Sequence, residues 1–156
     1  MPAAPAKVID CLQKSAALHL TAIEHYAALA EHLGRAGYGK LAERYRADAD
    51  EERGHLRAVQ ARLEYYQTQP TYQHAAPAWP RYDVPGILAA NLTLETATAA
   101  AERQHIVEAR SVADEFTALV FAELLEGSEQ SIKEIEADQF TITQIGIDNW
   151  LANQIA

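Results

Sequence analysis

Apolar residues recur every three or four positions along most of this chain, which is the spacing of one face of an α-helix. The clearest stretch runs from residue 7 to residue 33 and contains no glycine or proline. Its predicted inward face is the series Val8, Leu12, Ser15, His19, Ile23, Tyr26 and Leu33. Gly34, Gly37 and Gly39 follow and predict a turn. We therefore predict a first helix that ends at these glycines.

The same spacing predicts three further long helices and a short one. Their predicted spans are residues 40–67, 84–110, 111–144 and 147–155. We divide the third helix from the fourth at Ser111, because a serine followed three residues later by the acidic Asp114 is typical of a helix start. Gly146 separates the fourth helix from the short fifth one.

The segment between the second and third helices, residues 68–85, predicts a long connection. It contains four prolines, which exclude a helix, and the aromatic residues Tyr72, Trp79 and Tyr82, which favour packing along the surface of the other helices. Helices of roughly 26 to 32 residues are about 40–48 Å long. About 17 extended residues reach about 56 Å, enough to return along that length.

These lengths predict the architecture. The first and second helices share a short turn, as do the third and fourth, so each pair forms an antiparallel hairpin. One long crossover between two such hairpins is the ferritin-like topology. We predict an all-α, ferritin-like four-helix bundle over residues 1–156, a single domain with one crossover and a short C-terminal fifth helix.

The composition narrows the possible partners. The chain has 22 acidic and 13 basic residues, which gives a formal net charge of −9. Nucleic acids and anionic membranes attract clustered basic residues, so this balance disfavours both and suits a protein that attracts cations. The single cysteine, Cys11, excludes an internal disulfide framework. We find neither signal-peptide regions nor a membrane-spanning stretch and expect a cytoplasmic protein.

Polar residues on the predicted inward faces are the candidates for chemistry. His19 lies on the inward face of the first helix, and Glu52 and His55 on the second form a Glu-x-x-His pair, whose spacing lets both bind one ion. Glu95 lies among apolar residues of the third helix, where a carboxylate needs a compensating charge. The bundle topology brings these four residues to one level, which predicts a site for a divalent metal such as iron or zinc.

The sequence also predicts the surroundings of other polar residues outside this site. Glu102 lies seven residues after Glu95 and Arg62 seven after His55, so we predict that they form a buried ion pair. His105 is ten residues from Glu95 and is expected at the surface. His25 and His32 lie beside the inward face of the first helix and are expected at the surface or between subunits.

At these residues the sequence resembles bacterioferritin along its whole length. The similar segments are residues 7–12, 20–26, 50–55, 92–95 and 147–155. The resemblance implies a four-helix bundle with a short fifth helix. It also implies hollow cages of twenty-four chains, oxidation of Fe²⁺ at a di-iron site, storage of ferric mineral, and haem between paired subunits.

The chain departs from the bacterioferritin pattern at several ligand positions. The resemblance assigns metal-ligand roles to Glu52, His55 and Glu95, which are present. His19 stands where the family has a glutamate, and Ser128 and Ser131 stand where it has a second Glu-x-x-His. The haem-ligand methionine is replaced by Arg53, and Met1 is the only methionine, so haem is not expected.

These departures predict one bound divalent metal rather than two, and weak or absent di-iron ferroxidase activity. The leading hypothesis is an iron-storage or iron-handling cage protein, a homo-oligomer or a subunit of a mixed cage with an active bacterioferritin. An alternative is a ferritin-like enzyme with a mononuclear two-histidine, one-carboxylate centre, an oxidase or a peroxide-consuming protein. A third possibility is a non-catalytic structural subunit.

Overall fold

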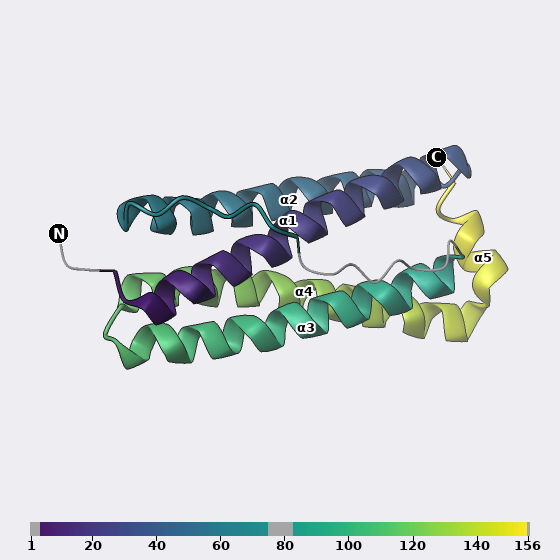
Figure 1. Cartoon of the computed structure of the whole chain (residues 1–156). Helices are drawn as coiled ribbons and strands as arrows, with labels where there is room; N and C mark the ends of the chain where they lie inside the picture. Colours follow the sequence, from purple (N-terminus) through teal and green to yellow (C-terminus); the bar gives the residue numbers. More distant parts are fainter. Residues whose placement is uncertain (1–3, 75–82, 156) are drawn as a thin grey trace.

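The computed structural model describes residues 4–74 and 83–155, and within them the regular structure is entirely α-helical. The helices are α1 (Ala6–Arg35), α2 (Gly39–Tyr65), α3 (Val84–Ser111), α4 (Glu115–Ile145) and the short α5 (Ile147–Ala152). The four long helices pack as a bundle (Figure 1). This confirms the predicted all-α, ferritin-like fold.

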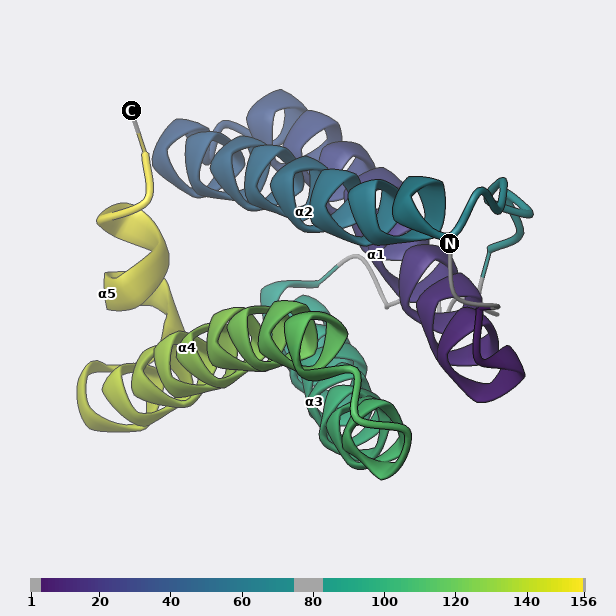
Figure 2. The same ribbon diagram turned by 90° about the vertical axis from the view of Figure 1, so that its left-hand side faces the viewer.

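The helices form two antiparallel hairpins, α1 with α2 and α3 with α4 (Figure 2). Because α2 and α3 run in the same direction, the chain between them has to return along the bundle (Figure 1). Its described part lies along α1: Gln13 Nε2 donates to the Gln69 carbonyl at 2.8 Å, and His74 Nε2 lies 2.9 Å from Glu24 Oε2. The aromatic residues Trp79 and Tyr82 lie outside the described residues.

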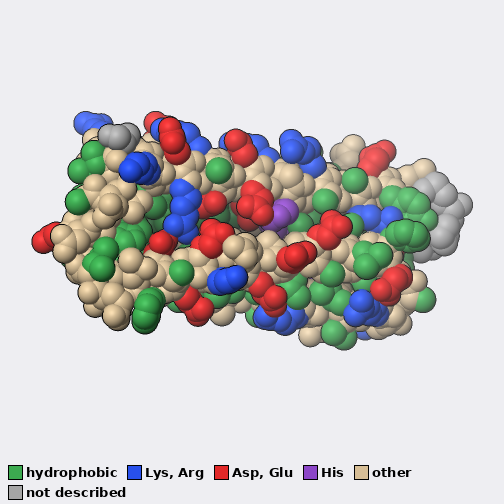
Figure 3. All heavy atoms as spheres, turned by 180° about the vertical axis from the view of Figure 1, so that it is seen from behind, with side chains coloured by type: hydrophobic (Ala, Val, Ile, Leu, Met, Phe, Trp, Pro, Cys, Tyr) green, Lys and Arg blue, Asp and Glu red, His purple; other side chains and the backbone are tan. Residues whose placement is uncertain are grey.

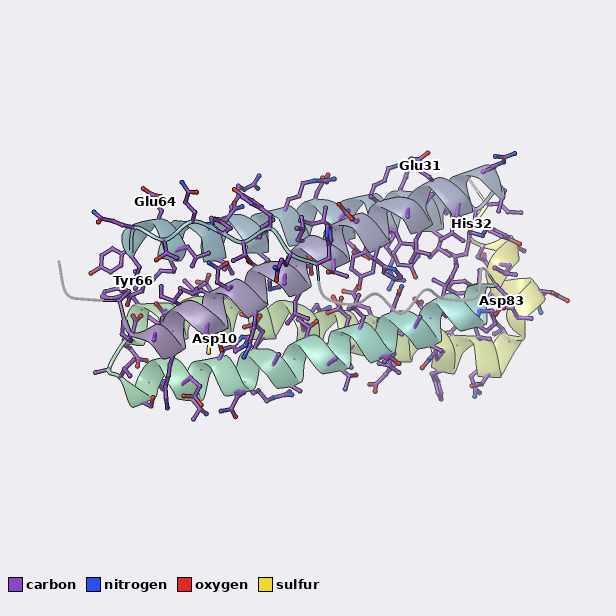
Figure 4. The ribbon with its side chains drawn as sticks, viewed as in Figure 1. Asp10, Glu31, His32, Glu64, Tyr66 and Asp83 are labelled. Carbon is purple, nitrogen blue, oxygen red and sulfur yellow. The ribbon has the colours of Figure 1, made fainter. Side chains whose placement is uncertain are left out.

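Aspartate side chains set the starts of α3 and α4. Asp83, labelled in Figure 4, accepts a hydrogen bond from the Gly86 amide at 2.8 Å. Asp114 accepts one from the Thr117 amide at 3.1 Å, so α4 begins after Asp114. The predicted start at Ser111 is therefore wrong by about one turn. Ser111 is the last residue of α3, and its hydroxyl donates to a carbonyl of that helix.

The buried apolar residues form two clusters, one toward each end of the bundle. The cluster near α5 includes Leu33, Leu41, Tyr45, Leu88 and Trp150. The cluster at the opposite end includes Val8, Leu12, Leu63, Ala109 and Phe121. Each long helix contributes apolar residues to both clusters, and buried polar residues lie between these two sets of positions. The bundle therefore encloses a polar layer, and this layer holds the candidate site.

The outer faces of the bundle are hydrophilic over much of their area. Glu31 on α1 and Glu64 on α2 point away from the bundle (Figure 4). The C-terminal segment closes one end, where the Lys40 amide donates to the Gln154 carbonyl at 3.1 Å. Among the described helices, none is long and apolar enough to cross a membrane.

Candidate metal site

Three of the four predicted ligands meet inside the bundle. Potential ligand atoms of His19, Glu52 and His55 all lie within 4.8 Å of one another. His19 Nδ1 is 2.6 Å from Glu52 Oε2, and His55 Nδ1 is 3.4 Å from Glu52 Oε1. Two imidazoles thus face one carboxylate, a donor set that suits Zn²⁺ or Fe²⁺. We call these three residues the triad.

Without a metal, the triad is held together by a buried ion pair. Burial acts to lower the pKa of His19, but the carboxylates of Glu102 and Glu52 outweigh it and raise this pKa to about 9. Burial likewise acts to raise the pKa of Glu52, yet contacts with His19 and His55 lower it to about 2. At neutral pH His19 is therefore protonated and Glu52 ionised. A metal that binds His19 has to displace this proton.

Glu95 is buried next to the triad but bonds to other partners. It accepts a hydrogen bond from the Tyr26 hydroxyl, and the hydroxyl of Ser128 acts on it to lower its pKa. Burial, with the nearby charge of Glu52, raises the pKa of Glu95 to about 7 against the opposing effect of these bonds. Among the described residues, the cluster of close ligand atoms does not extend to Glu95. Its predicted role as a ligand stays a prediction.

Helix α4 contributes close packing to the site. Ser128 is buried against Glu95, and Ser131 is only partly buried. At Gly127 the helix backbone approaches the ring of His55 so closely that an added Cβ would lie 2.8 Å from Cε1. A larger residue at position 127 would have to displace the ring. The histidine therefore occupies space that Gly127 leaves open.

The triad lies close to an acidic hollow in the surface between α2 and α4. This hollow has a volume of about 570 Å³, and His55 forms part of its lining. The remaining lining residues are Glu51, Glu123, Glu126, Gly127, Glu129, Gln130 and Lys133. Figure 3 shows a histidine at the surface among acidic side chains on this side of the molecule. An excess of carboxylates around an opening attracts cations toward it.

The sequence has a clear family relationship. The family model for the ferritin-like domain matches residues 9–141, which is most of the chain. The chain belongs to the ferritin-like domain family. No curated protein matches it. The family agrees with the observed helix order and crossover, while the closer resemblance to bacterioferritin stays a prediction.

The ferritin-like bundle contains a second cluster of buried polar side chains, around Glu102 and His105, and the sequence predicted other surroundings for both residues. Glu102 is fully buried, and its carboxylate lies 3.3 Å from His19 Nε2. The Ser15 hydroxyl donates to it at 2.6 Å, and His105 Nδ1 lies 3.1 Å away. His105 is thus buried rather than exposed, because its ring also packs against Phe121.

The predicted ion pair between Arg62 and Glu102 is not among the ion pairs of the described residues. Arg62 instead contacts Asp114 at 3.1 Å and Thr117 at 2.9 Å, while Glu102 is paired with histidines. The turn after α3 places Asp114 at the start of α4, and the long side chain of Arg62 reaches it there. This prediction is therefore corrected.

His25 and Arg53 are the two remaining positions, and only His25 lies in a different environment from the predicted one. His25 is buried rather than exposed, because its Nε2 lies 2.7 Å from Asn91 Oδ1, and Asn91 in turn donates to the Tyr45 hydroxyl at 3.0 Å. Arg53, at the haem-ligand position of the resemblance, is exposed and pairs with Asp50. The hydrogen bond between the His25 ring and the Asn91 side chain allows the histidine to be buried. The sequence contains no pattern that would have predicted this contact.

Proposed function

We propose that this ferritin-like chain is an iron-handling protein of bacterioferritin type that binds one divalent metal ion through the triad. The observation that carries the proposal is the meeting of His19, Glu52 and His55 inside the bundle. The acidic hollow beside His55 provides a route along which carboxylates attract cations toward the site. The ion is iron or zinc, since both accept nitrogen and carboxylate ligands.

The residues present fit such an ion. Nδ1 of His55 is buried and lacks a hydrogen-bond partner among the described residues, although it faces the Glu52 carboxylate. A buried polar atom without a partner is costly, and coordination would remove that cost. When bound, the metal would supply Lewis acidity or redox chemistry. The protein orients the two imidazoles and keeps the carboxylate ionised. Glu95 is the proposed fourth ligand, after its bond with Tyr26 is released.

A second metal ion has less support at the positions used in bacterioferritin. Two cations at close range need bridging carboxylates to offset their repulsion. At the corresponding positions α4 provides the hydroxyls of Ser128 and Ser131, which are weak ligands while protonated. We therefore propose that di-iron ferroxidase activity is weak or absent in this chain.

Self-assembly is the second part of the proposal. Large apolar side chains are exposed on the α3–α4 hairpin, including Val107, Phe116, Leu119 and Phe140. Exposed apolar side chains of this size favour burial against another protein surface. We propose a homo-oligomeric cage, of twenty-four chains by resemblance, or a mixed cage with an active bacterioferritin subunit.

The alternative with its own observation is an enzyme with a mononuclear metal centre. Two histidines and one carboxylate are the ligand set of many iron enzymes that react with oxygen, and the triad has this composition. In this alternative the protein is an oxidase or consumes peroxide. Turnover of oxygen or peroxide by the iron-loaded protein, lost in His55→Ala, would favour it. A silent protein that retains the metal would favour the structural subunit.

Native mass spectrometry combined with metal titration tests the main proposal. Metal-free protein, titrated with Zn²⁺ or anaerobic Fe²⁺, is expected to bind one ion per chain, and His55→Ala is expected to lose it. His74→Ala is the matched control, because His74 is exposed in the connection after α2 and lies outside the triad. Two tightly bound ions at the positions used in bacterioferritin, or no binding at all, would contradict the proposal.

A further inference from the structure

The ring of His19 lies between two carboxylates from different helices. Its Nδ1 is 2.6 Å from Glu52 on α2, within the triad. Its Nε2 is 3.3 Å from Glu102 on α3. This second contact has ion-pair distance but does not have hydrogen-bond alignment, so Nε2 lacks a hydrogen-bond partner among the described residues. A small rotation of the ring or of the carboxylate would align it.

Glu102 is itself held in place. It is fully buried, its Oε1 accepts a hydrogen bond from Ser15 on α1, and its Oε2 faces His105 one turn along α3. Its ion-pair partners among the described residues are both histidines, His19 and His105. The Glu102 carboxylate thus faces the outer nitrogen of His19.

This arrangement matches the way proteins support metal-bound histidines. A histidine that coordinates a metal through one nitrogen usually donates its other N–H to a carboxylate, carbonyl or water. That bond fixes the tautomer and the ring orientation and raises the basicity of the coordinating nitrogen. Here a proton on Nε2, facing Glu102, leaves the lone pair of Nδ1 directed toward Glu52 within the triad.

We propose that Glu102, held by Ser15 and His105, is a positioning residue that fixes the tautomer and orientation of His19 for metal binding by the triad. This inference rests on the proposed metal-binding function. It assigns a role to a carboxylate that lies outside the triad and has no counterpart among the ligand positions of the resemblance. It also explains why a fully buried glutamate is surrounded by two imidazoles and a hydroxyl.

A second metal ion at Glu102 and His105 is the competing explanation, because these residues repeat the Glu-x-x-His spacing of α2. The distances favour the positioning role. Among the described residues, the triad is the one group of three ligand residues whose atoms all lie within 4.8 Å of one another. The environment of Glu102 is instead occupied by hydrogen-bond donors. The two explanations predict different metal stoichiometries.

The experiment compares Zn²⁺ binding by the wild-type protein and Glu102→Gln, using a competing chelator for affinity and native mass spectrometry for stoichiometry. The amide keeps the size of the side chain but removes its charge. We expect binding to weaken by about 10- to 100-fold while the stoichiometry stays at one ion. Ser15→Ala, which loosens Glu102, is expected to weaken it less. Glu108→Gln is the control, since Glu108 is on α3 but pairs with Lys7 at the surface.

Nitrogen NMR of the zinc-loaded wild-type protein tests the same proposal even if Glu102→Gln does not fold. The proposal expects zinc on Nδ1 of His19 and a proton on Nε2. Zinc on Nε2 would overturn it, as would unchanged affinity in a folded Glu102→Gln protein. A fall from two ions to one in Glu102→Gln would show that Glu102 is itself a ligand. Absence of zinc binding in the wild type would instead refute the proposed function.

Discussion

The stability of the metal-free protein should fall when the pH is raised from 6 to 9. His19 has a pKa of about 9 in the folded chain, compared with the ordinary histidine value of 6.5 expected after unfolding. A raised histidine pKa contributes stability that is fully present below pH 6.5 and is lost as the pH rises through about 9. The reason is that the proton which joins His19 to Glu52 and Glu102 is then removed.

The magnitude follows from the difference between the two pKa values of His19. Each pKa unit corresponds to about 1.4 kcal/mol, so this histidine alone contributes on the order of 3 kcal/mol. Glu95 acts in the same direction at lower pH. Its pKa is raised from 4.5 to about 7, so its contribution is present below pH 4.5 and is lost as the pH rises through about 7.

At low pH the carboxylates Glu52 and Glu102 make the stability change in the opposite direction, so that it falls as the pH falls. The pKa values of Glu52 and Glu102 are both lowered from 4.5 to about 2, so their contribution is present above pH 4.5 and is lost as the pH falls through about 2. The contacts of both carboxylates with His19 also raise the pKa of His19, so the free energy of these shared contacts is counted once. Because the Glu95 contribution already declines above pH 4.5, the groups together place the highest stability of the metal-free protein near pH 4.5.

Urea unfolding followed by far-ultraviolet circular dichroism, with a chelator present, measures this effect. The wild-type free energy of unfolding should drop by at least about 3 kcal/mol between pH 6 and 9, because the remaining loss at Glu95 adds to the loss at His19. His19→Gln, which cannot carry the proton, should show a much smaller drop above pH 7. An equal drop in both proteins, or a flat wild-type profile, would refute the reasoning. Saturating Zn²⁺ should flatten the wild-type profile, because the metal replaces the proton on His19.

Four substitutions give further checks. Gly127→Ala should displace His55 and weaken Zn²⁺ binding in a chelator competition. Gly54→Ala is the control, because its added Cβ meets only Arg57 at 4.0 Å. It should leave Zn²⁺ binding unchanged and raise the free energy of unfolding by about 1 kcal/mol. Asp114→Ala should lower the urea-unfolding free energy by about 1–2 kcal/mol, since it removes the cap of α4. Phe121→Ala should lower it by about 3–5 kcal/mol by opening a cavity; no loss in either would contradict the assigned packing.

Much of the fold could be predicted from the sequence, because it depends on local patterns. The apolar spacing and the glycines around position 34 gave the first hairpin, and the prolines of residues 68–85 excluded a helix between the hairpins. The Glu-x-x-His spacing placed Glu52 and His55 on one face of α2. His19 followed because it lies seven residues before Tyr26, on the same buried face. These relationships lie within one helix, and its geometry fixes them.

Tertiary structure decided which neighbour each buried polar side chain contacts. Sequence spacing gives the face of a helix but leaves the rotation and crossing of its neighbours open. His105 is therefore buried despite lying off the stripe of Glu95, and Arg62 reaches Asp114 rather than Glu102. The position of Glu102 beside His19 depends on how α1 packs against α3. The sequence alone determined the candidate ligands, whereas the packing of four helices decided which groups support them.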